Sequence, residues 1–221
     1  MTEQLIKSKQ RVQQHGEVFT PRWMVEMMLD IPEIKSACEQ IHATFLEPAA
    51  GDGNFLLAIL ERKLQALTQQ YDKKNWKTKS LFALASIYGI EFLADNLEVA
   101  RDRLFIYYLD WYETQFGERL GSKTDLYRSA HFLIHRNIVR GNTLTKRHPD
   151  TNELIVFWEW QAIKGNPSKV SCKQVIFADM LGEKSAEATV VEGQLSLFEF
   201  DDDDQTQETI LPIQKVYQLR G

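Results

Sequence analysis

Cysteine is scarce in this sequence, and long apolar runs are absent. Cys38 and Cys172 are the only cysteines among 221 residues, too few and too far apart for a disulfide framework or a zinc cluster. No run reaches the roughly 18 apolar residues of a membrane-spanning helix, and residues 1–14 lack the apolar stretch of a secretion signal. We therefore expect a protein of a reducing, cytoplasmic compartment with no membrane partner.

The five histidines are not spaced with cysteines or carboxylates as metal ligands are. His131 and His135 are four residues apart, but surface or helix-capping roles are the favoured interpretation of this pair. No metal is expected.

Positive charge is not in excess: 26 Lys and Arg stand against 31 Asp and Glu, a net charge of −5. Nine of the acids and one of the bases lie in residues 183–208, and two further bases lie in residues 209–221, so residues 1–182 hold 22 acids and 23 bases. DNA is neither favoured nor excluded as a partner of this neutral body, because a basic face can be balanced by an acidic one. We expect a body over 1–182, an acidic flexible segment over 183–208 and a C-terminal strand over 209–221.

Apolar runs and helical stripes alternate along the body. We expect strands over 43–47, 83–90, 137–140, 154–160, 173–177 and 210–219. We expect helices over 21–30, from 54 onward, over 95–116 and over 126–134, with a Lys-rich surface connection over 72–79. This alternation is typical of an α/β fold with a doubly wound, mostly parallel sheet.

A turn of small residues separates the first strand from an amphipathic helix. Gly51 and Gly53 let the main chain turn sharply and approach a ligand closely, and the N–H groups that begin the helix point to the same place. The turn has no Lys followed by Ser or Thr, so a triphosphate is not expected. The carboxylates of Glu47 and Asp52 suit a ligand with hydroxyls and a positive amino group. Glu91 ends the second strand, where an acid binds ribose in nucleotide-type folds.

Four segments occur in a fixed order: Phe19–Pro21 before a helix, Phe45–Phe55, Tyr88–Glu91 and Asn137–Leu144. Together they resemble the adenine-specific (N6) DNA methyltransferases of restriction-modification systems, which are class I S-adenosylmethionine (AdoMet) enzymes. The resemblance covers roughly residues 16–144. It implies the Rossmann-like class I methyltransferase fold, AdoMet as cofactor and DNA as substrate.

The resemblance also implies which residues hold AdoMet. The methionine end is covered by Phe19, Thr20 and Pro21, and the methionine moiety is wrapped by Glu47, Pro48, Ala49, Gly51, Asp52 and Gly53. The ribose is bound by Glu91, and the adenine is contacted by Phe92 and Asn142. The family usually has Asp at the last position. Because an Asn there accepts a hydrogen bond without the assistance of charge, weaker cofactor binding is expected.

The family's catalytic motif, Asn or Asp followed by Pro-Pro and Tyr or Phe, is absent. In the family its polar groups accept hydrogen bonds from the target amino group, and its ring stacks on the flipped base. Asn166 and Pro167 lie in about the right window; a one-proline turn between strands is the favoured interpretation, and a degenerate catalytic turn is the alternative. The residues after Leu144 leave no room for a target-recognition domain. We therefore expect a partner chain to supply catalysis and recognition of the DNA sequence. The alternative is that the protein keeps the cofactor fold for another purpose.

The acidic segment contains a second resemblance. Its residues Gln194, Leu195, Ser196, Leu197 and Phe198 resemble the pentapeptide with which bacterial replication and repair proteins dock on the DNA sliding clamp. A strand that packs on its own domain is the alternative. Two functions therefore compete: a DNA adenine-N6 methyltransferase-like enzyme that needs a partner, or an inactive methyltransferase-like binding module recruited to the clamp.

Overall fold

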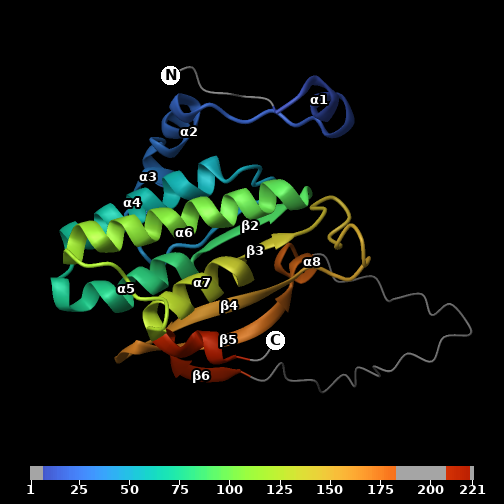
Figure 1. The fold of residues 1–221 in the computed structure, drawn as a ribbon. Coiled ribbons are helices and arrows are strands. Elements are labelled where there is room, and N and C mark those ends of the chain that lie inside the picture. Colours follow the sequence, from blue (N-terminus) through green and yellow to red (C-terminus); the bar gives the residue numbers. More distant parts are fainter. Residues whose placement is uncertain (1–6, 183–207, 220–221) are drawn as a thin grey trace, which may run out of the picture.

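The computed structural model describes residues 7–182 and 208–219, arranged as in Figure 1. The helices are α1 (Lys9–His15), α2 (Arg22–Leu29), α3 (Pro32–Cys38), α4 (Asn54–Gln70), α5 (Lys73–Ala85), α6 (Ala94–Phe116), α7 (Asp125–Asn137) and α8 (Phe177–Met180). The strands are β1 (Phe45–Glu47), β2 (Ile87–Glu91), β3 (Ile138–Arg140), β4 (Val156–Ile163), β5 (Asn166–Ile176) and β6 (Thr209–Pro212), and a 3₁₀ helix, η1 (Ile213–Gln218), follows. The pentapeptide at 194–198 lies outside the described residues.

Three parallel strands form the centre of the fold, in the order β1-β2-β3. Phe45 lies opposite Ile87, and Gly89 lies opposite Ile138. β2 is buried along its whole length, because it has a strand on each side and a packed layer on each face. A mixed α/β fold with a parallel sheet was predicted, and these three strands confirm it.

The connection between β1 and β2 is more helical than the sequence predicted. Residues 72–79, expected as a surface connection, lie mostly in α5, and residues 83–85, expected in a strand, end the same helix. The Nζ atoms of Lys73 and Lys77 lie 5.3 and 4.9 Å from the centre of the Phe116 ring. The ammonium groups of both lysines thus lie against the Phe116 ring in cation–π contacts.

α4 and α6 pack on one face of the parallel sheet, as Figure 1 shows. α4 begins directly after Gly53, whose φ of 88° is left-handed. Its apolar stripe includes Leu56, Leu60 and Leu64, which are fully buried. A Cβ on Gly53 would lie 3.0 Å from the Cα of Ala100 in α6, so the absence of a side chain lets the turn and α6 touch.

An antiparallel sheet in the order β4-β5-β6 covers the other face. Tyr88 and Ile90 of β2 pack there against Phe157 of β4 and Phe177 of α8. The sequence predicted a doubly wound, mostly parallel sheet, and the antiparallel second sheet corrects that prediction. Two long strands joined by a tight turn at Gly165 can pair only as a hairpin.

The strand expected over 210–219 is only partly a strand. β6 ends at Pro212, which has no N–H with which to extend a ladder, and η1 begins at the next residue. Ile213 and Val216 are fully buried. They are three residues apart, which places them on one side of a 3₁₀ turn.

Candidate functional site

The carboxyl ends of β1, β2 and β3 border one cavity of about 610 Å³, a volume typical of small-molecule sites. Its walls come from the N-terminal stretch, the turn after β1, the residues at the end of β2 and the loop after β3. The lining residues are Gln14, Gly16, Glu17, Val18, Phe19, Pro48, Ala49, Gly51, Glu91, Phe92, Leu93, Asn96, Gly141, Asn142, Thr143 and Leu144.

Glu91 joins two of these walls. Its Oε2 accepts the main-chain N–H of Gly51 at 2.7 Å, and its Oε1 accepts that of Leu93 at 2.8 Å. The residue is 7% exposed, and this burial raises the pKa of its carboxyl above the ordinary value. Glu91, which the resemblance assigns to the ribose, thus holds the glycine turn. Because each carboxylate oxygen has two lone pairs, Glu91 can also accept a hydrogen bond from a ligand.

Asp52 is directed to α6 rather than to the cavity. Its carboxylate forms an ion pair with Arg103 at 2.7 Å, and Arg103 also donates to the side-chain oxygen of Asn54 at 2.8 Å. Burial raises the pKa of Asp52, an effect that Arg103 opposes. The turn is therefore anchored by α6 on one side and by Glu91 on the other.

The twelve residues that the resemblance assigns to AdoMet fall into two groups. Seven line the cavity: Phe19, Pro48, Ala49, Gly51, Glu91, Phe92 and Asn142. Five do not line it: Thr20, Pro21, Glu47, Asp52 and Gly53. Three of these five stabilise the main chain next to the cavity. The Thr20 carbonyl accepts from the Asn54 side chain at 3.1 Å, Pro21 is the N-cap of α2, and Glu47 Oε1 accepts the N–H of Ala49 at 3.0 Å.

Glu17 is a cavity residue that sequence reasoning missed. Arg11 of α1 donates to both of its carboxylate oxygens, and the Asn96 side chain donates to Oε1 at 2.8 Å. The bond from Arg11 is the largest cause that lowers the pKa of the Glu17 carboxyl. A single acid in a polar N-terminal stretch forms no pattern, and its partner Asn96 is 79 residues away.

Asn142 lies at the cavity, but its side-chain oxygen is engaged locally. The oxygen accepts the main-chain N–H groups of Leu144 at 3.0 Å and Thr145 at 3.3 Å, the arrangement of an Asx turn. Thr143 donates from its hydroxyl to the Pro48 carbonyl. The loop after β3 is thereby fixed against the turn after β1.

Asn166 and Pro167 lie at the start of β5, in the hairpin that follows β4. Asn166 is opposite Ile163 beside a β-bulge, and its side-chain oxygen accepts from Ser168 at 3.1 Å. Neither residue lines the cavity. Figure 1 shows the β4–β5 turn at the opposite end of the molecule from the carboxyl ends of the parallel strands.

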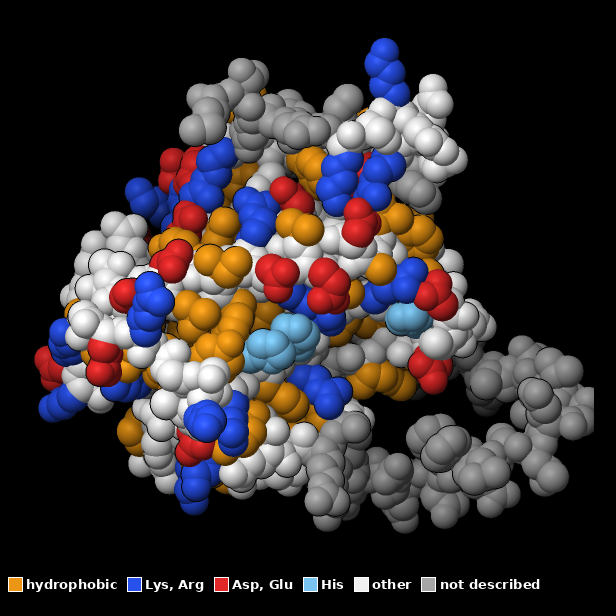
Figure 2. Space-filling view, viewed as in Figure 1, with side chains coloured by type: hydrophobic (Ala, Val, Ile, Leu, Met, Phe, Trp, Pro, Cys, Tyr) orange, Lys and Arg blue, Asp and Glu red, His pale blue; other side chains and the backbone are white. Residues whose placement is uncertain are grey.

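The charges around the fold are mixed. Figure 2 shows Lys and Arg interspersed with Asp and Glu over the visible face, rather than gathered into one basic patch. Within the part of the chain that the structure describes, no group of three or more His, Cys, Asp or Glu side chains could hold a metal ion. Over the same residues, no helix has both the length and the apolar character needed to cross a bilayer.

Comparison with known proteins adds no family. No family model, no curated protein and no solved structure matches this chain.

Proposed function

We propose that this chain is an AdoMet-binding, DNA adenine-N6 methyltransferase-like protein with a class I fold, which works with a partner chain in a restriction-modification or mobile-element setting. One observation carries the proposal. The glycine turn after β1 and Glu91 at the end of β2 meet through a 2.7 Å hydrogen bond on the wall of one cavity. Open α/β sheets bind their ligands at this edge, beyond the carboxyl ends of the strands.

The chemistry of the cavity fits AdoMet, which supplies the methyl group when bound. Its ribose hydroxyls and its amino group need acceptors, and the carboxylates of Glu91 and Glu17 both line the cavity. Phe92 is 41% exposed beside them and offers an aromatic ring to the adenine. Gly51 has no side chain to stand between the turn and the ligand.

Binding calorimetry tests the proposal. AdoMet and its demethylated product should both release heat with the wild type. Ala49→Trp should abolish the heat, because Ala49 is an exposed wall residue and an indole would occupy the cavity. Val99→Trp is the matched control, since Val99 is exposed on α6 and does not line the cavity. An absence of heat and of thermal shift at millimolar AdoMet in the wild type would reject the proposal.

The second candidate function is a binding module without turnover. It is favoured by the missing Asn-Pro-Pro-Tyr motif and by the position of Asn166 and Pro167 away from the cavity. Without an aromatic ring the flipped adenine loses stacking of roughly 1–3 kcal/mol. We therefore expect little or no transfer of labelled methyl to DNA by the purified chain alone. Robust transfer that Asn166→Ala abolishes would instead make this turn catalytic.

Docking on the sliding clamp stays a proposal for residues outside the described ranges. A peptide over 191–199 should bind the clamp modestly, because ordering a short peptide opposes binding. Leu197→Ala combined with Phe198→Ala should remove the binding, since apolar anchors carry most of the energy of such contacts. Equal binding by the doubly substituted peptide would reject the motif.

A further inference from the structure

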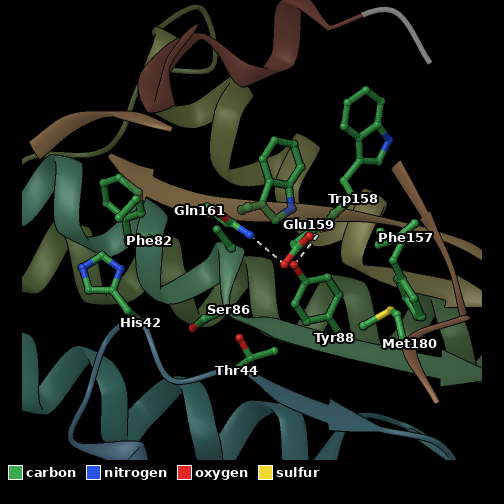
Figure 3. A pocket seen from close by; sticks show the side chains of 14 residues that line it. His42, Thr44, Phe82, Ser86, Tyr88, Phe157, Trp158, Glu159, Gln161 and Met180 are labelled. Carbon is green, nitrogen blue, oxygen red and sulfur yellow. Dashed lines mark hydrogen bonds between the residues drawn. The ribbon is translucent and has the colours of Figure 1, made fainter. Parts of the chain in front are cut away.

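Cavity walls in this protein differ in how firmly they are held. In the groove of about 340 Å³ that Figure 3 shows, Tyr88 of β2 reaches to β4 and donates from its hydroxyl to the Trp158 carbonyl at 2.8 Å. The lining residues Tyr88 and Phe157 are buried, so core packing fixes that groove. The cavity proposed for AdoMet has one wall of another kind, because Gln14 lies in α1 and Gly16 is the C-cap of the same helix.

The helix α1 lacks an apolar anchor. Among its residues whose side chains are described, none is buried, and only Arg11 and Val12 are half-buried. Figure 1 shows α1 outside the layer that α4 and α6 form. Because an isolated helix of seven residues is not stable in water, the position of α1 depends on polar contacts with the rest of the chain.

Those polar contacts converge on the start of α6 and on Glu17. Arg11 donates to Asp95 Oδ2 at 2.9 Å and to Asp95 Oδ1 at 3.0 Å, and Lys7 donates to the same carboxylate at 2.9 Å. Arg11 also donates to Glu17 Oε1 at 2.9 Å. The Asp95 side chain is 53% exposed, and ion pairs that are open to water are weak and screened by salt. α1 is thus held by contacts that open easily.

The main chain changes character between α1 and the body at Gly16. Its φ of 65° is left-handed, and a Cβ there would meet no atom of the described residues within 4 Å. The next residue, Glu17, is 9% exposed and accepts a hydrogen bond from the buried Asn96 side chain at 2.8 Å. A rotation at Gly16 therefore moves α1 and leaves Glu17 in its place on the cavity wall.

We infer that α1 is a latch on the cavity, which swings away at Gly16 when AdoMet enters or leaves and closes again beside the bound molecule. The inference deepens the proposed function and rests on it, because the latch regulates the AdoMet site. Closure brings Gln14 to the cavity and Arg11 to Glu17. When α1 swings away, Glu17 keeps the hydrogen bond from Asn96. A ligand that contacts Gln14 binds the closed form better and so shifts the latch toward closure.

The rates of AdoMet association and dissociation test the latch, measured by surface plasmon resonance on the immobilised full-length chain. Arg11→Met removes the contacts with Asp95 and Glu17, so the latch opens more often in both the free and the bound protein. We expect both rates to rise by at least about fivefold, the upper end of what an exposed ion pair contributes. Their ratio, the dissociation constant, should change by less than about twofold. Loss of an ordinary ligand contact would instead raise the dissociation rate alone.

Two further variants support the comparison. Lys9→Met is the matched control, because it removes a charge from an exposed residue of the same helix, and it should leave both rates at the wild-type values. Asp95→Asn removes the same ion pair from the side of α6 and serves if Arg11→Met fails to fold. Added salt should raise both rates in the wild type, since it screens exposed ion pairs, and should raise them less in Arg11→Met.

Amide exchange gives a second readout, because bound AdoMet should slow exchange in Lys9–His15. A rise of the dissociation rate alone, unchanged rates in Arg11→Met and Asp95→Asn, or exchange in α1 that AdoMet leaves unchanged overturns the latch. Calorimetry with AdoMet separates the latch from the proposed function. Heat together with unchanged rates rejects only the latch, whereas an absence of heat rejects the proposed function and the latch with it.

Discussion

The main-chain N–H of Gly51 donates to Oε2 of Glu91 across 2.7 Å and so joins the turn after β1 to the end of β2. The other oxygen of Glu91 accepts the N–H of Leu93. Both bonds go to a carboxylate that is 7% exposed. A charged acceptor in such a place makes stronger hydrogen bonds than a neutral one, so Glu91 ties the turn after β1 firmly to the end of β2.

Glu91→Gln should lower the free energy of unfolding by about 1–3 kcal/mol. The amide that replaces the carboxylate has one acceptor oxygen, so either Gly51 or Leu93 loses its acceptor and faces an NH₂ group instead. Urea denaturation at neutral pH measures the change. Glu113→Gln on the exposed surface of α6 is the control, with an expected change within about 0.5 kcal/mol. Equal stabilities of the two variants would contradict this role of Glu91.

The two glycines of the turn should respond differently to alanine. Gly53→Ala places a Cβ 3.0 Å from the main chain of Ala100 at a φ of 88°, and we expect a loss of about 1–3 kcal/mol from overpacking. Gly51→Ala meets only Phe19 at 3.5 Å, an ordinary contact, so its left-handed φ should lower stability by only about 1 kcal/mol. Denaturation midpoints compare the two variants. The reverse order would mean that α6 does not restrict the turn.

Local sequence patterns predicted the centre of the fold well. The leucine stripe and the glycine turn placed the start of a helix at Asn54, where α4 begins. Residues 83–85 were misjudged because a short apolar run suits a buried helix as well as a buried strand. The antiparallel sheet was missed for a different reason. The face of the parallel sheet that β4 and β5 cover is decided by contacts between residues far apart in the sequence, such as the rings of Tyr88 and Phe157.

From the order of elements alone, the cavity was predictable only near the ends of strands, and the family resemblance added Phe19. Gly51 and Glu91 stand at strand ends, so the order of elements brings them together. The Asn96 side chain donates to Glu17 only because the N-terminal stretch runs beside α6. No hydrophobic period and no sequence motif predicts that path. The ion pair that turns Asp52 to α6 was also unpredictable, because it depends on Arg103 one helix away.

The helix α1 should be held in place by Arg11. Arg11 donates to Glu17 and pairs with Asp95 at 2.9 Å, so Arg11→Met should speed amide exchange in Lys9–His15. Lys9→Met is the control, because Lys9 is an exposed residue of the same helix. Hydrogen exchange with mass spectrometry compares the two variants, and equal exchange would contradict the role of Arg11. The hydrogen bond from Arg11 lowers the pKa of Glu17, so this support is complete above the ordinary value of 4.5 and is lost as the pH falls through the lower folded pKa.

Lys63 is a buried amine beneath the segment that leads into β1. Its side chain is fully enclosed, and its Nζ donates to the carbonyls of Gln40 at 2.8 Å and Ala43 at 2.7 Å. Burial lowers the pKa of this amine from 10.5 to about 8. A neutral amine still has two N–H groups, so deprotonation leaves both carbonyls with a donor.

The unfolding free energy should therefore depend on pH through Lys63. The folded pKa lies below the unfolded one, so the unfolded chain binds more protons between about pH 8 and pH 10.5, and stability from this group rises with pH across that window. As the pH falls through 8, the contribution is lost. Urea denaturation at pH 7, 9 and 10 should show the stability of wild type relative to Lys63→Met increasing with pH, while other lysines titrate equally in both proteins. A difference that stays constant from pH 7 to 10 would mean that the buried amine keeps its proton, held as an ammonium by the two carbonyls and the ring of Phe45 5.1 Å away.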